Sequence, residues 1–345
     1  MKQNADITYL GRTFKTSITK PLTDDEYHEI VDYINQRPSK ESAKKELIKV
    51  KNGGLKISNI TGYYFLSLMY DARNGQDAWS INEALTNKKI MEYFNGKISV
   101  NDRVFNPSLP LGERVLTAFR LCGIRCCRKI PQFPLKAINE LLNEFTKPGD
   151  NYYDFSCGWG VRALSALVHD VNYFGTDPNE KLVEKIMEMV DDYNSVSLFN
   201  HDVDIRPIGS EVFVPEWENK MNFIFSSPPY FALEIYKSEN QSYKDGMSYQ
   251  EWLDSWMVPT IVNIRKYLKN DGVFAINVKD VLYGKKWYPL ESDTVELIER
   301  SGFVLDSYRT LKNIKRTFGN KSWEKHTTGI SDKADEKIFV FKKMA

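Results

Sequence analysis

The sequence predicts an α/β fold in which helices cover both faces of a largely parallel sheet. From about residue 134 onward, short apolar segments alternate with longer segments of helical periodicity, the pattern of parallel strands joined by crossover helices. The last two apolar segments follow one another without such a helix. We therefore expect them to pair as antiparallel neighbours at one edge of the sheet.

Each element of this region has its own signal. Residues 133–147 carry apolar residues at 135, 138, 141, 142 and 145, a helical face that Pro148-Gly149 stops. Strands are expected over 151–155, 171–177, 195–202, 221–227 and 272–280, with the closing pair over 303–311 and 337–343. Further helices are expected over 161–170, 178–193, 248–269 and 292–302, the second of these starting at a favoured first-turn proline.

The chain before this region predicts a second domain. Thr23 is a good N-cap for a helix with acidic residues in its first turn. Further helices are expected over 39–51, 59–73 and 80–96, the last ending at Asn95-Gly96. We therefore divide the chain into a mainly helical domain, residues 1–130, and an α/β domain, residues 131–345.

The composition is that of an ordinary globular protein. Of the 345 residues, 42% are hydrophobic and 27% are charged, and no apolar run approaches the length of a membrane span. The first twenty residues lack the apolar core of a signal peptide, so we expect a cytoplasmic protein without a membrane partner. Nothing in the composition indicates the oligomeric state.

The cysteines do not predict a metal site. Three of the four lie in "RLCGIRCCRK", residues 120–129, where the C-x3-C-C spacing is not a usual zinc pattern and no histidine is near. We expect reduced thiols and no metal.

The charge is unevenly distributed along the chain. Residues 1–130 contain 21 Lys plus Arg against 14 Asp plus Glu, a balance of +7, whereas the remainder contains 26 against 32, a balance of −6. A basic half beside an acidic half suggests that one part of the protein meets a polyanion.

Two features at expected strand ends suggest a cofactor site. "DFSCGWG", residues 154–160, follows the first strand and opens a helix, and Gly158 and Gly160 allow a tight turn and close approach of a ligand. Asp177 ends the second strand, where a carboxylate can accept both hydroxyls of a ribose. Ligands of such sheets bind at the carboxyl ends of the strands, so the pair favours a nucleoside-containing cofactor. The alternative for Asp177 is a helix N-cap.

A third feature follows the fourth strand. In "SSPPYF", residues 226–231, the prolines fix the backbone, Ser227 offers a hydroxyl acceptor and Tyr230 offers a flat face. A planar heterocycle could stack on Tyr230 while its exocyclic amine donates to Ser227 and to a proline-linked carbonyl. The alternative is a simple strand-ending turn.

The order of "DFSCGWG", "GTDP" and "SSPPY" resembles the S-adenosylmethionine-dependent amino-methyltransferases of DNA, most of all phage or prophage-borne modification enzymes. The resemblance covers about residues 130–345 and implies a Rossmann-like seven-stranded methyltransferase sheet. One departure is that Phe155-Ser156 stands where Pro-Phe is usual. This leaves open whether Phe155 or Trp159 supplies the aromatic contact to the cofactor.

The resemblance also implies site residues. Those for the target amine would be Ser227, Pro228, Pro229 and Tyr230. Those for S-adenosylmethionine would be Phe155, Ser156, Cys157, Gly158, Trp159, Gly160, Asp177, Pro178 and Asp202, the last placed after the third strand with Asp204 as its competitor. Residues 133–150 resemble the segment that covers the methionine carboxylate in this family.

A base inside a duplex must be extruded before it reacts, so such an enzyme needs basic surface on the DNA. Candidates lie in three segments, one of which could close over the base with Tyr236 and Tyr243. The basic candidates are Arg114, Arg120, Arg125, Arg128, Lys129, Lys237, Lys244, Lys315 and Arg316. Residues 1–130 are the candidate target-recognition domain.

The sequence leaves several alternatives open. S-P-P-Y resembles the cytosine-N4 enzymes slightly more than the adenine-N6 enzymes, because Ser227 lacks the charge of an aspartate. The other readings are an RNA or protein-nitrogen methyltransferase, a phage base-hypermodifying transferase on the same scaffold, and a nucleic-acid-binding protein with a degenerate sheet. We favour DNA over RNA as the partner.

Overall fold

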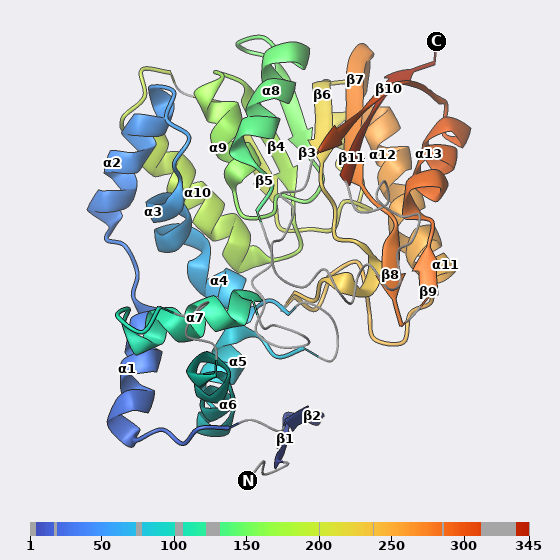
Figure 1. The fold of residues 1–345 in the computed structure, drawn as a ribbon. Helices are drawn as coiled ribbons and strands as arrows, with labels where there is room; N and C mark the ends of the chain where they lie inside the picture. The colour runs from blue at the N-terminus through green and yellow to red at the C-terminus, as the bar shows by residue number, and fades with distance from the viewer. Residues whose placement is uncertain are drawn as a thin grey trace. The chain divides into compact units, whose positions relative to one another are not determined.

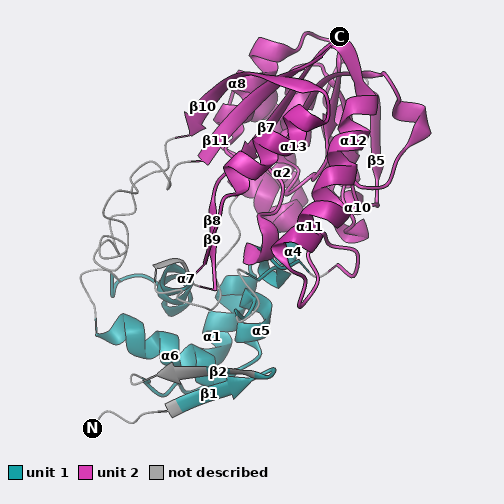
Figure 2. Cartoon of the chain, turned by 90° about the vertical axis from the view of Figure 1, so that its right-hand side faces the viewer, with its two compact units in different colours: residues 1–39, 66–131, 234–237 teal, residues 40–65, 132–233, 238–345 magenta. Residues whose placement is uncertain are grey.

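A computed structural model describes residues 5–16, 19–73, 78–100, 106–121, 132–199, 201–236, 238–284, 286–311 and 336–344. These residues form two compact units, which Figure 2 shows in different colours. The first unit comprises residues 1–39, 66–131 and 234–237, and the second comprises residues 40–65, 132–233 and 238–345.

The second unit contains a seven-stranded sheet of the predicted class (Figure 1). Its order is β10-β11-β7-β6-β3-β4-β5, and all neighbours pair in parallel except β11, which is antiparallel to both β7 and β10. The strands are β3 (Asn151–Asp154), β4 (Asn172–Thr176), β5 (Val203–Arg206), β6 (Met221–Ser226), β7 (Leu268–Val278), β10 (Phe303–Leu311) and β11 (Glu336–Lys343). The predicted antiparallel pair at one edge is confirmed.

Helices of the second unit contact the sheet in two groups. The first group is α8 (Leu135–Phe145), α9 (Val161–Val168) and α10 (Glu180–Asn194), and the second is α12 (Val258–Tyr267) and α13 (Leu290–Arg300). Figure 1 shows the second group beside β7 and β11. With both faces covered, the central strands are almost continuously buried, which explains why their sequences read as apolar runs.

The third strand differs from its prediction. We expected it over 195–202, but β5 is Val203–Arg206, whereas residues 195–196 form a turn and residues 198–199 a bend. Leu198 and Phe199 are 93% and 60% exposed, so their apolar pattern does not reflect burial. The pairing register between β5 and β4 sets where the strand begins, since Val203 pairs with Tyr173.

Other elements depart from the expected boundaries. The long helix expected over 248–269 is divided into α11 (Tyr249–Trp252), a π-helix (Leu253–Met257) and α12, after which β7 already begins at Leu268. Two antiparallel hairpins were not predicted. They are β1 (Ala5–Tyr9) with β2 (Arg12–Thr16), and β8 (Val281–Tyr283) with β9 (Lys286–Tyr288).

The first unit is mainly helical. It contains α1 (Asp24–Asn35), α4 (Leu66–Asp71), α5 (Ile81–Leu85), α6 (Lys88–Ser99) and α7 (Leu111–Leu121) around a common apolar core. Thr23 caps α1 as predicted, in a capping box with Glu26.

The division between the units differs from the boundary at residue 130. Residues 40–65, with α2 (Lys40–Lys51), α3 (Ser58–Ile60) and a π-helix (Thr61–Phe65), belong to the second unit. Asp192 of α10 holds this segment, since its carboxylate accepts a hydrogen bond from Tyr64 at 2.7 Å and pairs with Lys40 and Lys44. These contacts link residues far apart in sequence, which local patterns do not show.

Candidate active site

The loop between β3 and α9 lies at the carboxyl edge of the sheet and depends on two glycines. Gly158 and Gly160 have φ angles of 58° and 68°, in the left-handed region that favours glycine. Gly160 is also the N-cap of α9, and no side chain caps that helix end. Backbone N–H groups of the first turn are therefore available to a negatively charged ligand group.

The buried ion pair of Asp154 and Arg162 holds the glycine loop in place. The Arg162 Nε lies 2.7 Å from the Asp154 Oδ2, and the two side chains are 5% and 0% exposed. Arg162 also donates to the main-chain oxygen of Ser156, and Tyr173 donates to Asp154 at 2.9 Å. Burial lowers the pKa of Arg162, but the charge of Asp154 outweighs it and raises the pKa above its usual value. Asp154 is thus committed to holding the loop and does not face a ligand.

Asp177 follows β4 next to the glycine loop. Its Oδ1 accepts the backbone N–H of Asn179 at 3.1 Å, and its own backbone N–H donates to the main-chain oxygen of Arg206. Burial raises the pKa of Asp177 to about 7, although backbone donors at Asn179 and Gly158 lower it. Hydroxyl donors would therefore stabilise the ionised form of this carboxylate. The alternative role of helix N-cap is not filled by Asp177, because Asn179 caps α10.

The aromatic residues of the loop are buried. Phe155 is 2% exposed, and its ring packs against Phe274 and Tyr153, so it belongs to the core of the unit. Trp159 is 6% exposed. Cys157 is a buried free thiol whose Sγ lies 3.5 Å from the Thr176 main-chain oxygen. Both aromatic side chains are buried, so the choice between Phe155 and Trp159 as the aromatic contact stays open.

Residues 58–65, which the sequence did not single out, also contact this edge, together with Phe133 from the 133–150 segment that the resemblance placed over the methionine carboxylate. The Phe65 ring lies so close to Gly160 that a Cβ there would be 2.5 Å from its Cζ. Thr61 exchanges hydrogen bonds with Gln132, and the neighbouring Phe133 packs against Phe225 of β6. These contacts arise because residues 58–65 pack against the sheet unit. No local sequence motif predicts this packing.

The segment after β6 places its polar groups against β7. The Asn277 Nδ2 lies 3.0 Å from the Ser227 Oγ and 2.9 Å from the Tyr230 hydroxyl. Tyr230 is 6% exposed, and the Lys279 ammonium lies over its ring at 5.5 Å from the centroid. Ser226, the last residue of β6, is fully buried, and its hydroxyl donates to the Ser156 main-chain oxygen. The serine–proline segment and the glycine loop are thus in direct contact.

An aromatic cluster surrounds the next residue, Phe231. Its φ angle is 45°, which is rare for a bulky side chain and marks local strain. Five rings pack around it, from Tyr243, Tyr249, Trp252, Tyr283 and Tyr288. Tyr243, expected to close over a base, is therefore a buried member of this cluster, at 4% exposed. The hairpin of β8 and β9 supplies two of the rings.

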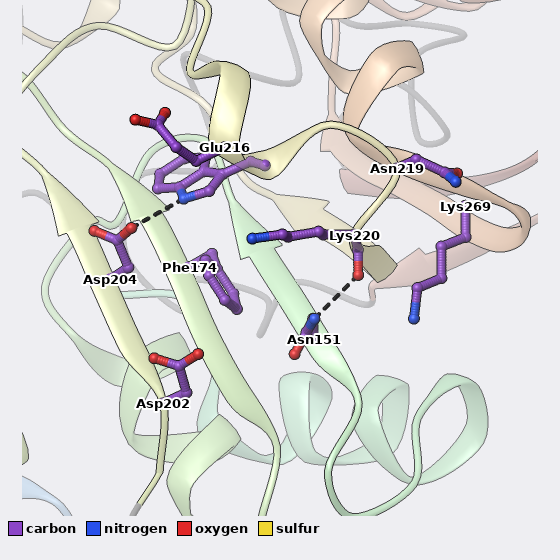
Figure 3. A pocket seen from close by; sticks show the side chains of 9 residues that line it. Asn151, Phe174, Asp202, Asp204, Glu216, Asn219, Lys220 and Lys269 are labelled. Carbon is purple, nitrogen blue, oxygen red and sulfur yellow. Dashed lines mark hydrogen bonds between the residues drawn. The ribbon is translucent and has the colours of Figure 1, made fainter.

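Asp202 does not lie where we expected it. Because β5 begins at Val203, Asp202 precedes the third strand and lies at the amino edge of the sheet, opposite to Asp177. It is exposed and lines a polar pocket of about 390 Å³ with Asn151, Phe174, Asp204, Glu216, Trp217, Asn219, Lys220 and Lys269 (Figure 3). Its competitor Asp204 pairs with Arg206 and accepts from the Trp217 Nε1 at 3.0 Å. Neither acid joins the glycine loop.

Few of the expected nucleic-acid contacts can be located. Lys244 is exposed, and Arg114 is half-buried on α7, with a buried Nε that has no partner among the described residues. Arg120 lies on α7, but its side chain is outside the described part of the chain. Arg125, Arg128, Lys129, Lys237, Lys315 and Arg316 also lie outside the described residues. Tyr236 donates to Glu234 at 2.8 Å within the first unit.

The described residues contain no helix that is both long and apolar enough to cross a membrane. In the same residues, no cluster of three or more His, Cys, Asp or Glu side chains is arranged to hold a metal ion.

No protein-family model and no curated protein matches the sequence. Among solved structures, the chain is similar to a TehB-like SAM-dependent methyltransferase from Corynebacterium glutamicum, with 17% identity, coverage of 60% of this chain and 86% of that chain, and a TM-score of 0.38. It is also similar to the 1,6-didemethyltoxoflavin-N1-methyltransferase of Burkholderia thailandensis, with 11% identity, 61% and 78% coverage, and a TM-score of 0.41. A third is TrmN from Thermus thermophilus, with 15% identity, 61% and 48% coverage, and a TM-score of 0.38.

Proposed function

We propose that the protein is an S-adenosylmethionine-dependent methyltransferase that acts on the exocyclic amine of a DNA base. The observation that carries the proposal is the meeting of three features at the carboxyl edge of one sheet. They are the glycine loop after β3, Asp177 after β4 and Ser227–Tyr230 after β6. In sheets of this kind, that edge is where ligands bind.

The residues present fit the proposed cofactor. Gly158 and Gly160 keep the loop free of side chains, and the uncapped start of α9 suits a carboxylate. Burial raises the pKa of Asp177, so further hydrogen-bond donors, such as the two hydroxyls of a ribose, would favour its ionised form. When bound, S-adenosylmethionine supplies an electrophilic methyl group on its sulfonium. We drop Asp202 from this set because it lies at the other edge.

The residues after β6 would hold the target amine. Pro228 and Pro229 fix the backbone, so the carbonyl oxygens have set directions, and the Ser227 Oγ can accept an N–H. Lys279 lies over one face of Tyr230, so a base would stack against the opposite face. Orientation of the amine lone pair is the main catalytic contribution expected of this arrangement.

DNA as the substrate rests on the sequence resemblance and on the basic balance of residues 1–130. Within DNA we keep cytosine N4 slightly ahead of adenine N6, because the neutral Ser227 stands at the first position of the tetrapeptide. The test is mass spectrometry of nucleosides from cells that express the chain. N4-methylcytosine is the expected product, and N6-methyladenine would change the base but not the reaction class.

The same experiment separates the other candidate functions. Methylated nucleosides found only in RNA would replace the DNA substrate, and a larger adduct would indicate hypermodification. Unmodified DNA and RNA, together with no cofactor binding by calorimetry, would overturn the proposal. A variant with Ser227→Ala and Tyr230→Ala, expressed in parallel, shows whether a product depends on this site.

A further inference from the structure

Phe231, the residue after the proposed amine-binding segment, has a strained backbone conformation. Its φ angle of 45° is one that glycine adopts easily and that a bulky side chain rarely adopts. The residue is buried, at 3% exposed, and it begins the short 3-10 helix Phe231–Leu233. Such strain persists only where the surrounding structure holds the residue in place, and it gathers at functional sites. The contacts that hold Phe231 are therefore candidates for a role in the amine site.

The hairpin of β8 and β9 supplies part of this support. β8 follows β7 directly along the chain, so the strand beside the amine site also leads into the hairpin. Val281 pairs with Tyr288, and side chains alternate along a strand, so Tyr283 and Tyr288 lie on the same face of the hairpin. That face packs on Phe231, with ring centroids at 5.9 Å for Tyr283 and 5.2 Å for Tyr288.

Three further rings come from the segment after Phe231. Tyr243 lies at 5.2 Å, and α11 contributes Tyr249 at 5.4 Å and Trp252 at 5.9 Å, each measured between ring centroids. Tyr288 of the hairpin also contacts Tyr249, at 4.9 Å, and Figure 1 shows the hairpin beside α11. The two groups of rings therefore support each other as well as Phe231. Tilted and edge-to-face ring contacts are favourable, and several together can hold a residue against backbone strain.

The conformation of Phe231 also fixes the residue before it. Pro228 and Pro229 restrict the backbone on one side of Tyr230, and Phe231 fixes it on the other. The Leu233 N–H donates to the Tyr230 main-chain oxygen at 3.0 Å, which closes the turn. The two neighbouring side chains consequently lie in different places, with the Phe231 ring in the aromatic cluster and the Tyr230 hydroxyl against β7.

We infer that the β8–β9 hairpin is a positioning element of the proposed amine site, in which Tyr283 and Tyr288 hold Phe231 in its left-handed conformation and thereby fix the ring of Tyr230. A base that stacks on Tyr230 depends on the direction of this ring, because a small displacement of the reacting amine lowers the rate of transfer. A Phe231 that relaxed to a negative φ angle would open the turn, and the ring would lose its fixed direction. The inference rests on the proposed function of this site.

The activity test removes one ring of the hairpin. Tyr288→Leu keeps an apolar side chain but loses the ring contacts with Phe231 and Tyr249. We expect kcat for methyl transfer to fall by about tenfold, while the cofactor Kd stays within about twofold, because positioning of the reacting amine acts on kcat. Tyr288→Phe keeps the ring, so its kcat should stay within about twofold of the wild-type value.

A matched control comes from another tyrosine of the same unit. Tyr308 of β10 packs against Phe339 of β11, with ring centroids 6.1 Å apart. Tyr308→Leu removes a ring in the same way and should leave kcat within about twofold of the wild-type value. Equal falls in kcat for Tyr308→Leu and Tyr288→Leu would show that the loss of any ring contact lowers activity, which contradicts a specific role for the hairpin.

A double-mutant cycle tests whether the hairpin acts through Tyr230. The Tyr230→Ala variant has no ring to position, so adding Tyr288→Leu to it should lower kcat by less than about twofold more. A further fall of about tenfold would mean that the hairpin affects transfer independently of Tyr230, and the inference would be wrong.

Crystal structures of the wild type and of Tyr288→Leu test the positioning without an activity assay. In the variant, Phe231 should leave the left-handed region and the Tyr230 hydroxyl should move out of hydrogen-bond distance of the Asn277 Nδ2. Unchanged positions contradict the inference even where modified nucleosides support the proposed function. An unmodified nucleoside profile from the wild type contradicts the proposed function, whereas the two structures still decide whether the hairpin positions Tyr230. If Tyr288→Leu does not fold, as judged by its melting temperature, Tyr283→Leu takes its place in each test.

Discussion

The two edges of the same sheet carry similar residues with different surroundings. At the amino edge, Asp202 is exposed, Asp204 is paired with Arg206, and the pocket of Figure 3 is lined by charged groups of both signs. At the carboxyl edge, Asp177 is partly buried, with a pKa raised to about 7. The carboxyl edge also has a helix start without a side-chain cap. Strand direction thus places acids of the same type in different surroundings, partly buried beside the glycine loop at one edge and exposed or paired at the other.

The largest expected effect comes from the glycines at the two edges. Gly160→Ala should destabilise the fold by about 3–5 kcal/mol, because it adds left-handed strain and a Cβ at 2.5 Å from Phe65. Gly149, before β3, has a φ angle of 85° and nothing within 4 Å of a Cβ, so Gly149→Ala should cost only about 1–2 kcal/mol. Urea unfolding of both variants measures the difference, and equal costs would show that Phe65 moves aside.

The next effect concerns the acids. Asp177→Ala should weaken S-adenosylmethionine binding by about 1.5–3 kcal/mol, the range for hydrogen bonds to a charged group. Asp202→Ala should leave the affinity unchanged, because its side chain lies at the amino edge. Calorimetry on the two folded variants tests this. A loss of affinity with Asp202→Ala and not with Asp177→Ala would reverse the assignment of the edges.

Within the carboxyl edge, Tyr230 separates the target from the cofactor. Tyr230→Ala should reduce methyl transfer by about 1–3 kcal/mol through lost stacking, while cofactor binding persists. Tyr230→Phe should retain part of the activity, since it keeps the ring and loses the bond with Asn277. Parallel transfer assays and calorimetry check this. Equal losses of cofactor affinity and activity would place Tyr230 in the cofactor site.

The smallest expected effect is a pH dependence of stability and of cofactor affinity that arises from Asp177 at the carboxyl edge. The acids of the amino edge should not contribute to it. The pKa of Asp177 is raised from 3.8 to about 7 by burial. A raised folded-state pKa means that this carboxyl favours the folded state most below its unfolded pKa. That contribution is lost as the pH rises through about 7. Cofactor affinity has the opposite trend, because the ionised carboxylate accepts the ribose hydroxyls, so it should rise between about pH 6 and 8.

The matching variant is Asp177→Asn, which cannot ionise. Its cofactor affinity should be weaker and flat over this pH range, and the unfolding free energy of the apoprotein should fall less between pH 5 and 8 than in the wild type. Titration calorimetry and urea unfolding at several pH values measure both. An unchanged pH profile in Asp177→Asn would assign the dependence to another group.

Much of the fold could be predicted because its signals are local. The apolar runs of β3, β4, β6 and β7 and the helical periodicity between them depend on neighbours within a few residues, and so does the capping box of Thr23. The predicted position of the third strand was wrong because it also relied on a local pattern. The apolar residues Leu198 and Phe199 of the expected strand are exposed, and only the pairing of Val203 with Tyr173 locates the strand.

The sequence by itself determined the class of sheet and which residues stand at three strand ends: the Gly158 loop, Asp177 and Ser227–Tyr230. These follow from alternation, glycine positions and prolines, which act along the chain. Only the tertiary structure decided that Asp202 faces the other edge, that residues 40–65 join the second unit, and that Phe65 lies on Gly160. It also brought Asn277 of β7 to Ser227, and Glu336 of β11 to Asn277. The physical reason is that register and side-chain packing join residues far apart in sequence, and no periodicity within one segment encodes its partner.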